Sequence, residues 1–402
     1  MNLFRRARAA CQWLSAEWRL PQAARSERGR DRANRLDGDP GQEALIEACV
    51  AWLCRAQDFS TTRDGGVAHN FSLVSGWSSS YPETTGYIVP TFLELASQLR
   101  RDDLRARARR MLDWFVAIQL ESGAFQGGKI DSRPVVPVVF NTGQILLGLA
   151  AGVREFGAVY RESTQRAADW LVEVQDPDGC WRKGGSPFAL SGDRTYDTHV
   201  AWGLLEAARA TGERRYGEAA LRNIRWALTR QNAKGWFADC CLSDPRAPLT
   251  HTLGYALRGV LEGFVYERDP RLLDRARLTA DGLLGAMRGD GFLPGMLADD
   301  WQPRANWACL TGTAQVAHCW LLMFAETRER RYLTAANAAL GYVRCRVHMT
   351  GEPDTVGAVK GSYPVDGDYM PYGFPNWAAK FLLDATLMEQ SVHSADLKRA
   401  AG

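Results

Sequence analysis

Proton-transferring and acidic side chains gather in short segments that each precede a long apolar stretch. Glu83 closely follows Tyr81, and Asp197 stands two residues before His199. Histidine, tyrosine and carboxyl groups can take or give a proton, and a pair of carboxylates can cleave a glycosidic bond. The candidate catalytic residues are therefore His199, His251, Tyr369, Glu83, Asp197 and Asp368.

The same segments are rich in aromatic rings and in polar groups. Aromatic rings stack on the faces of sugar rings while polar groups bind sugar hydroxyls, so this mixture is typical of a carbohydrate-binding cleft. The candidate substrate-binding residues are Trp77, Tyr81, Tyr87, Tyr196, Tyr255, Arg304, Trp307, Tyr363, Asp366, Tyr372, Asn376 and Trp377.

Two kinds of sugar reaction fit these residue types. Hydrolysis needs two carboxylates that flank the sugar. Epimerisation or lysis of a uronate needs a base for the C5 proton, an acid opposite it and a cation for the substrate carboxylate. Arg304 or Lys360 could supply that cation. The carboxylates available for hydrolysis are Glu83, Asp197, Asp366 and Asp368.

Each candidate histidine also has a structural interpretation, as a buried and hydrogen-bonded side chain. His199 aligns with Tyr87 by repeat position, and His251 aligns with Glu83. A repeat position that changes its chemistry while its neighbours stay apolar is more typical of a cavity wall than of a core. We therefore favour a site role for both histidines. His318 lies deeper in its apolar stretch, and we expect it in the core.

A fixed period shows which elements must position these residues. A polar or aromatic residue opens an apolar stretch six times, at steps of 57, 55, 56, 60 and 62 residues. Such self-similarity indicates one repeated supersecondary unit. The six residues are Tyr87, Gln144, His199, Tyr255, Gln315 and Trp377. Between them, a tryptophan is followed five residues later by a glutamine at Trp52 and Gln57, Trp114 and Gln119, Trp170 and Gln175, and Trp226 and Gln231.

Both series have helical spacing, and glycines such as Gly123 and Gly179 follow the second series where a helix would end. Each unit is therefore a helical hairpin, and hairpins must stack to bury both faces. We predict an all-α fold, an (α/α)6 barrel (toroid) of six helical hairpins, with the first series as its inner ring. The inner N-termini then converge on one mouth, whose partial positive charge suits an anionic group.

The stretch Ala168-Asp169-Trp170-Leu171, with Gln175, Gly179 and Trp181, is similar to the Gln-Trp repeat of terpenoid cyclases. Over residues 43–389 the chain resembles the (α/α)6 toroids of six-hairpin sugar-active enzymes, terpenoid cyclases and protein prenyltransferases. The stretches 81–87 and 363–369 look like those of bacterial proteins linked to surface-polysaccharide synthesis. The Asp-rich motifs of terpenoid cyclases are absent, and a prenyltransferase-like zinc site has only Asp239-Cys240-Cys241 in its favour. We therefore expect no metal and no cofactor.

Charge and composition divide the chain further. Residues 1–36 hold nine arginines against three acids, although the whole chain carries only +3, which gives nucleic-acid binding no support. We predict a basic amphipathic helix and linker over residues 1–40, the toroid over 41–390 and a tail over 391–402. The helix over residues 2–20 could cap the toroid, or contact a partner or an anionic membrane surface. Residues 21–40 are expected to be the linker.

Three further observations bear on location. No run of 18 apolar residues occurs, so we expect no transmembrane helix. The first 20 residues lack the pattern of a secretory signal. Nine scattered cysteines fit reduced thiols, so we expect a cytoplasmic protein, peripheral to the inner membrane face if the N-terminal helix docks there.

These observations favour a carbohydrate-active enzyme that acts on an acidic, uronate-containing oligo- or polysaccharide. Proton abstraction, of the C5-epimerase or lyase type, is preferred slightly over hydrolysis because the converging helix ends favour an acidic sugar. The alternatives are a toroid enzyme like terpenoid cyclases or prenyltransferases, and a non-catalytic toroid that binds a glycan or a protein in polysaccharide biosynthesis.

Overall fold

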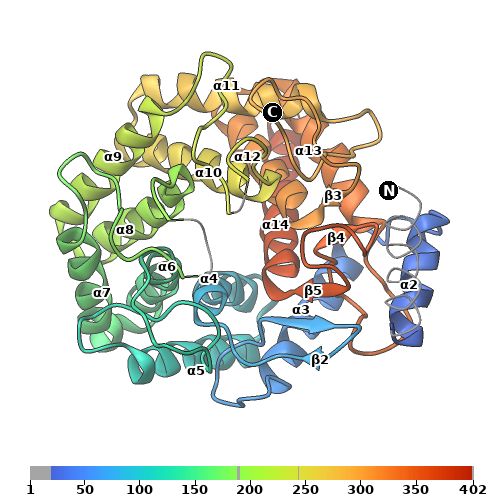
Figure 1. Ribbon diagram of the computed structural model, residues 1–402, viewed down its shortest axis with the longest axis horizontal. Coiled ribbons are helices and arrows are strands. Elements are labelled where there is room, and N and C mark those ends of the chain that lie inside the picture. Colours follow the sequence, from blue (N-terminus) through green and yellow to red (C-terminus); the bar gives the residue numbers. More distant parts are fainter. Residues whose placement is uncertain (1–19, 188–190, 243, 401–402) are drawn as a thin grey trace, which may run out of the picture.

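The computed structural model describes residues 20–187, 191–242 and 244–400, with side chains to residue 396. Twelve helices form two concentric rings (Figure 1). The outer ring consists of α3 (Gln42–Asp58), α5 (Asp102–Ile118), α7 (Arg161–Glu173), α9 (Arg214–Thr229), α11 (Pro270–Ala286) and α13 (Arg330–Arg344). The inner ring consists of α4 (Pro82–Leu99), α6 (Val139–Phe156), α8 (Thr198–Thr211), α10 (Thr250–Glu267), α12 (Leu310–Thr327) and α14 (Asn376–Ala400).

The inner ring is closed. Helix α14, the last inner helix, packs against α12 on one side and against α4, the first inner helix, on the other. It also packs against α3, so the two ends of the helical array meet (Figure 1). This arrangement confirms the predicted all-α (α/α)6 barrel of six hairpins.

Small residues let the inner helices approach one another closely. A Cβ on Gly203 of α8 would lie 2.3 Å from the carbonyl oxygen of Gly143 of α6, and one on Gly148 would lie 2.4 Å from that of Gly86 of α4. Such distances leave no room for a side chain. The many glycines and alanines of the first series are therefore the reason that six helices can surround so narrow a centre.

The glutamine of the second series fastens each outer helix to the next. Gln119 donates from Nε2 to the carbonyl oxygens of Gly123 and of Ser163 in α7, at 2.8 and 3.0 Å. Gly123 has a φ of +91°, and a Cβ there would lie 2.4 Å from the carbonyl oxygen of Arg166. Gln175 repeats the arrangement with Gly179 and with Ala219 of α9. The repeat thus encodes a contact between successive hairpins.

Short strands hold the loops beside the starts of the inner helices. One sheet has the order β2-β1-β5, formed by Gly76–Trp77, Asn70–Ser72 and Gly373–Pro375. Strand β3 (Ala308–Cys309) pairs with β4 (Ser362–Tyr363). A 3-10 turn, η2 (Thr195–Asp197), leads directly into α8, and η1 (Gly157–Tyr160) leads into α7. These pairings bring the segments around residues 70 and 370 together at one end of the barrel.

The structure adds helices to two of the predicted segments. Residues 21–40, predicted as a linker, contain helix α2 (Gln22–Arg32), whose acidic residues pair with the toroid. In the predicted tail, α14 continues from the toroid to Ala400 and buries Val392. The amphipathic helix predicted for residues 2–20 lies almost entirely outside the described residues.

Two expectations about composition can be compared with the described part of the chain. No helix there combines the length and apolar character needed to cross a lipid bilayer. The eight cysteines within it are all free thiols, and most are buried.

Candidate active site

A cavity of about 370 Å³ lies at the N-terminal ends of the inner helices. Its walls come from the first turns of α4, α6, α10 and α14 and from the loops that precede them. Ten of the lining residues carry polar or aromatic side chains that matter below: His69, Tyr81, Glu83, Tyr87, Asn141, Tyr196, His251, Tyr255, Tyr369 and Trp377. The N-terminal ends of inner helices therefore surround a cavity, at the end of the barrel where the sequence predicts the mouth.

Glu83 is the carboxyl group in the cavity wall. It is the second residue of α4, it is only 9% exposed, and its Oε2 accepts a 2.7 Å hydrogen bond from the hydroxyl of Tyr81. Burial raises the pKa of Glu83 to about 7, although the hydrogen bond from Tyr81 acts in the opposite direction. Glu83 is therefore protonated to a large extent near neutral pH and can act as an acid.

His251 is held as a neutral imidazole on the same cavity. Its Nδ1 lies 2.5 Å from Oε1 of Gln315, and a carbonyl oxygen can only accept, so Nδ1 carries the proton. Burial lowers the pKa of His251 to about 4, although the hydrogen bond to Gln315 opposes this change. Its Nε2 therefore keeps a free lone pair at neutral pH, which is the state that a general base requires.

Two tyrosine rings lie beside His251. The ring of Tyr255 lies 4.4 Å from that of His251, and the ring of Tyr369 lies 5.4 Å from it. Burial raises the pKa of both tyrosines well above the ordinary value, and for Tyr255 the nearby charge of Glu83 adds to the effect. Tyr369 thus stays protonated, and its hydroxyl accepts a 2.8 Å hydrogen bond from Nε1 of Trp377. These phenols are donors in the site, not bases.

Two further polar groups of the wall are buried. Tyr87 lies beside the phenol of Tyr255 and Asn141 beside the phenol of Tyr81, and both line the cavity. Each can also bind a ligand or water, because hydroxyl and amide groups make more than one hydrogen bond. They are suited to bind the hydroxyls of a sugar.

His199 does not line the cavity. It is the second residue of α8 and is buried, with its ring 4.3 Å from that of Tyr255 and 5.0 Å from that of Trp202. Its Nδ1 lies 2.5 Å from Oε1 of Gln144. Burial lowers its pKa well below the ordinary value, with Arg258 and Lys380 adding to the shift. The structure therefore places this candidate behind the wall, where it supports Tyr255.

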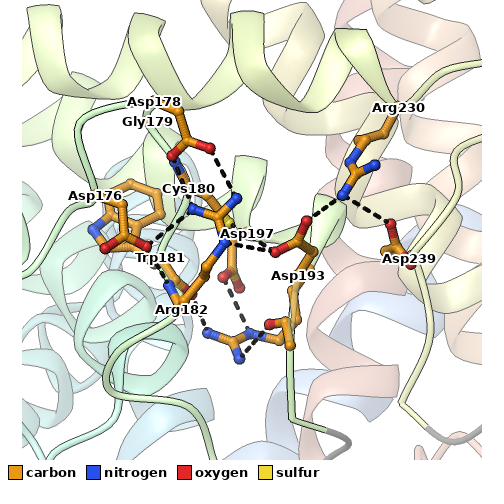
Figure 2. A network of polar contacts seen from close by, with 12 residues as sticks. Asp176, Asp178, Gly179, Cys180, Trp181, Arg182, Asp193, Asp197, Arg230 and Asp239 are labelled. Carbon is orange, nitrogen blue, oxygen red and sulfur yellow. Dashed lines mark hydrogen bonds and ion pairs between the residues drawn. The ribbon is translucent and has the colours of Figure 1, made fainter.

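Asp197 also turns away from the cavity. Its Oδ2 lies 3.2 Å from Nε of Arg194, and both side chains are buried. Arg194 in turn donates to the carbonyl oxygen of Trp181 at 2.8 Å. Asp197 belongs to the polar network that also contains Arg182 and Asp193 (Figure 2). Its neighbour in sequence, Tyr196, is the residue that reaches the cavity wall.

Four candidates lie on a different surface. Asp368 and Arg304 are exposed and line a wide depression on the outside of the molecule, together with Asp366 and Trp307. The prediction that Asp368 joins Glu83 is therefore not supported by their positions. Sequence adjacency misleads here because Asp368 and Tyr369 point in different directions from one loop.

The remaining candidates have structural partners. Trp77 packs on Trp52, with ring centroids 5.5 Å apart. Tyr363 donates to Oδ1 of Asn34 at 2.8 Å, and the hydroxyl of Tyr372 accepts from Arg28 at 3.4 Å. Asn376 donates to the carbonyl oxygen of Ala68 at 2.8 Å and fixes the loop that carries His69.

The sequence interpretation missed two residues of the wall. His69 packs edge-on against Tyr81 and Trp377, at 4.7 and 4.8 Å, and burial lowers its pKa to about 4. Asn141 is the third residue of α6. The signal for Asn141 was its place at the start of an inner helix, which Glu83 and His251 share. His69 has no such signal, because it lies in the loop between α3 and α4, well before α4 begins at Pro82.

The opposite end of the barrel has a second cavity, of about 330 Å³. His318, predicted to lie in the core, lines this cavity beside Arg258. Four acids each stand seven residues after a repeat position. Glu94, Glu206 and Asp384 line this cavity, and Glu262 pairs with Arg258, which lines it. Lys380 pairs with Asp384 at 2.6 Å.

No group of three histidine, cysteine or acidic side chains in the described residues is placed to hold a metal ion. In the segment Asp239-Cys240-Cys241, the thiol of Cys240 donates a 3.3 Å hydrogen bond to the carbonyl oxygen of Thr252.

Comparison with known proteins agrees with this architecture. The model of the squalene-hopene cyclase C-terminal domain family matches residues 80–259, which is less than half of the chain. No curated protein sequence matches the chain. The protein has the (α/α)6 toroid fold, and its particular relatives among solved structures are distant in sequence.

Three solved structures illustrate the likeness. The unsaturated glucuronyl hydrolase from Bacillus sp. GL1 is 16% identical, with a TM-score of 0.69, over 88% of this chain and 98% of that one. A D-mannose isomerase is 13% identical, with a TM-score of 0.70, over 87% and 97%. The cellobiose 2-epimerase from Bacillus thermoamylovorans B4167 is 11% identical, with a TM-score of 0.65, over 86% and 97%. At these identities the likeness establishes the fold alone.

Proposed function

We infer that the protein is a carbohydrate-active enzyme that transfers protons on an acidic sugar, with His251 as base and Glu83 as acid. The observation that carries this proposal is the pairing of opposite states in one cavity. His251 is neutral with a free Nε2, whereas Glu83 holds its proton up to about pH 7. A pair in which burial raises the pKa of an acid and lowers the pKa of a base is suited to acid–base catalysis, because each group is in its reactive state at the same pH.

The reaction proposed is removal of the C5 proton of a uronate by Nε2 of His251. The carboxylate next to C5 makes that proton removable. Glu83 then gives its proton either to the opposite face of C5, which completes an epimerisation, or to the oxygen that leaves C4, which completes a lysis. Hydrolysis needs two carboxylates and has less support. Among the described residues, Glu83 is the only one with a carboxyl group in the cavity wall.

Neither of the two cations that the sequence suggests as partners of a substrate carboxylate reaches the cavity. Arg304 lies on the outer depression, and Lys360 is paired with Asp31 at 2.5 Å, so neither can neutralise a substrate carboxylate in the cavity. The first turns of α4, α6, α10 and α14 supply partial positive charge instead. A bound carboxylate would also keep Glu83 protonated. The similarity to unsaturated glucuronyl hydrolases supports the same substrate class.

The test is incubation of the purified protein in D2O with polyuronates, with unsaturated glucuronyl disaccharides and with neutral aldoses, followed by proton NMR. We expect deuterium at C5 of a uronate, or an unsaturated product, and loss of both with His251→Asn. Conversion of neutral aldoses alone would reject the acidic substrate class. Release of reducing sugar with neither deuterium at C5 nor an unsaturated product would reject proton abstraction in favour of hydrolysis.

A terpenoid-cyclase-like reaction is a second candidate. The family-model match over residues 80–259 favours it, and so does the aromatic wall, since rings such as Tyr255 and Trp377 can stabilise a cation. Incubation with squalene and with prenyl diphosphates, analysed by mass spectrometry, distinguishes it. A cyclised hydrocarbon product would replace the sugar proposal.

A further inference from the structure

Helix α2 lies outside the two rings of the toroid (Figure 1). Glu27, Asp31 and Arg32 all contact the segment between His348 and Asp366, and Arg28 donates to the hydroxyl of Tyr372. Lys360, which is only 2% exposed, lies 2.5 Å from Oδ1 of Asp31 and also contacts Glu27. Four charged or chargeable groups therefore meet in one buried cluster between α2 and this segment.

The cluster also holds the backbone beyond Lys360. Oδ2 of Asp31 accepts a 2.8 Å hydrogen bond from the backbone N–H of Val365. The hydroxyl of Tyr363 donates to the carbonyl oxygen of Asp31 at 3.2 Å. His348 contacts Oε1 of Glu27 at 2.7 Å. Because buried charges are stable only when they are paired, α2 and this segment must stay together for the cluster to exist.

A short path leads from the cluster to the cavity. Two residues after Lys360, the hydroxyl of Ser362 donates to the carbonyl oxygen of Tyr369 at 2.7 Å and accepts from its N–H at 3.1 Å. Tyr369 then presents its ring to His251 and its hydroxyl to Trp377. The position of Tyr369 thus depends on a loop that is fixed at its base by α2.

We propose that α2 is a clamp of the active site, in which Lys360, Glu27 and Asp31 act as positioning residues for Tyr369. The effect on catalysis rests on the function proposed above, but the clamp itself does not. Loss of Lys360 leaves Glu27 and Asp31 buried without their cation, which should release α2 and loosen residues 360–373. The toroid, whose helices are fastened to one another independently, should stay folded.

The test compares hydrogen–deuterium exchange in the full-length protein and in Lys360→Met. We expect exchange over residues 22–32 and 360–373 to accelerate about tenfold or more, with helices α5 to α11 unchanged. Lys380→Met is the matched control, since it breaks another buried lysine–carboxylate pair, with Asp384, that does not involve α2. Unchanged exchange in the two segments, or equal acceleration throughout the molecule, would overturn the clamp.

The triple variant Glu27→Gln, Asp31→Asn, Lys360→Met provides the rescue. It removes the uncompensated charges while the side chain of residue 31 can still accept from Val365, so we expect protection to return in large part. On a substrate found by the screen above, Lys360→Met should raise KM about tenfold and the triple variant should restore it. Released segments with unchanged kinetics would reject the positioning of Tyr369 while leaving the clamp standing.

Discussion

Nδ1 of His251 lies 2.5 Å from Oε1 of Gln315, and a second pair, His199 and Gln144, is joined at the same distance. Both glutamines occupy repeat positions of inner helices. Of these two histidines only His251 lines the cavity, so His199 and Gln144 provide an internal control for the role proposed for His251.

Replacement of Gln315 by glutamate tests the role of His251. A carboxylate beside Nδ1 favours the imidazolium, so Gln315→Glu should raise the pKa of His251 and move the acidic limb of the kcat/KM profile upward by about one pH unit or more. Gln144→Glu should leave that limb in place, because His199 does not reach the substrate. Equal displacement by both variants would contradict the assignment of His251 as base.

Glu83→Gln should lower activity strongly, to a low but measurable level, and stabilise the fold. The pKa of Glu83 is about 7 in the folded state against an ordinary value of 4.5, so the folded state loses stability as the pH rises from about 4.5 to about 7. A shift of this size corresponds to about 3 kcal/mol above pH 7, as an order of magnitude. Urea unfolding at pH 8 should show the gain in the variant, and unfolding at pH 4 should not. Equal stability of the two proteins at pH 8 would contradict the buried acid.

Asp197→Asn separates a structural role from a catalytic one. It leaves the guanidinium of Arg194 buried beside a neutral amide, which should cost about 3 kcal/mol of unfolding free energy. The kcat/KM of the folded fraction, measured well below the melting temperature, should stay close to that of the wild type. Loss of activity with full stability would instead return Asp197 to the catalytic residues.

Asp368→Asn should have almost no effect on either property. The side chain is exposed on the outer depression, and substitutions of this kind stay within about 0.5 kcal/mol, which is about twofold in kcat/KM. Steady-state kinetics with the same substrate as above is the measurement. A hundredfold loss would show that the outer depression takes part in catalysis.

The architecture could be predicted from the sequence because its determinants are local and repeated. Gln119, Gln175 and their equivalents stand at fixed offsets from a tryptophan and a glycine, and each makes the same two hydrogen bonds. The small residues of the inner series mark the helices that must approach closely. Helix α2 was missed because its stability comes from Lys360, more than 300 residues away, rather than from its own composition.

The site could be predicted only in part. Placement at inner helix starts correctly brings Glu83, His251, Tyr255 and Trp377 into one cavity. It does not tell which side of a loop each residue faces, and so it grouped Asp368 with Tyr369. It also cannot distinguish His199, which is buried behind Tyr255, from a residue in the wall itself.

The pH dependence of kcat/KM tests the central claim most directly, because it reports the acid and the base of the free enzyme. With His251 as the base and Glu83 as the acid, activity should be greatest between about pH 4 and about pH 7 and should fall on both sides. The upper limb should be absent from the residual activity of Glu83→Gln. Activity that instead rises through pH 7 and persists above it would show that ionised Glu83 is the reactive form, which contradicts the account.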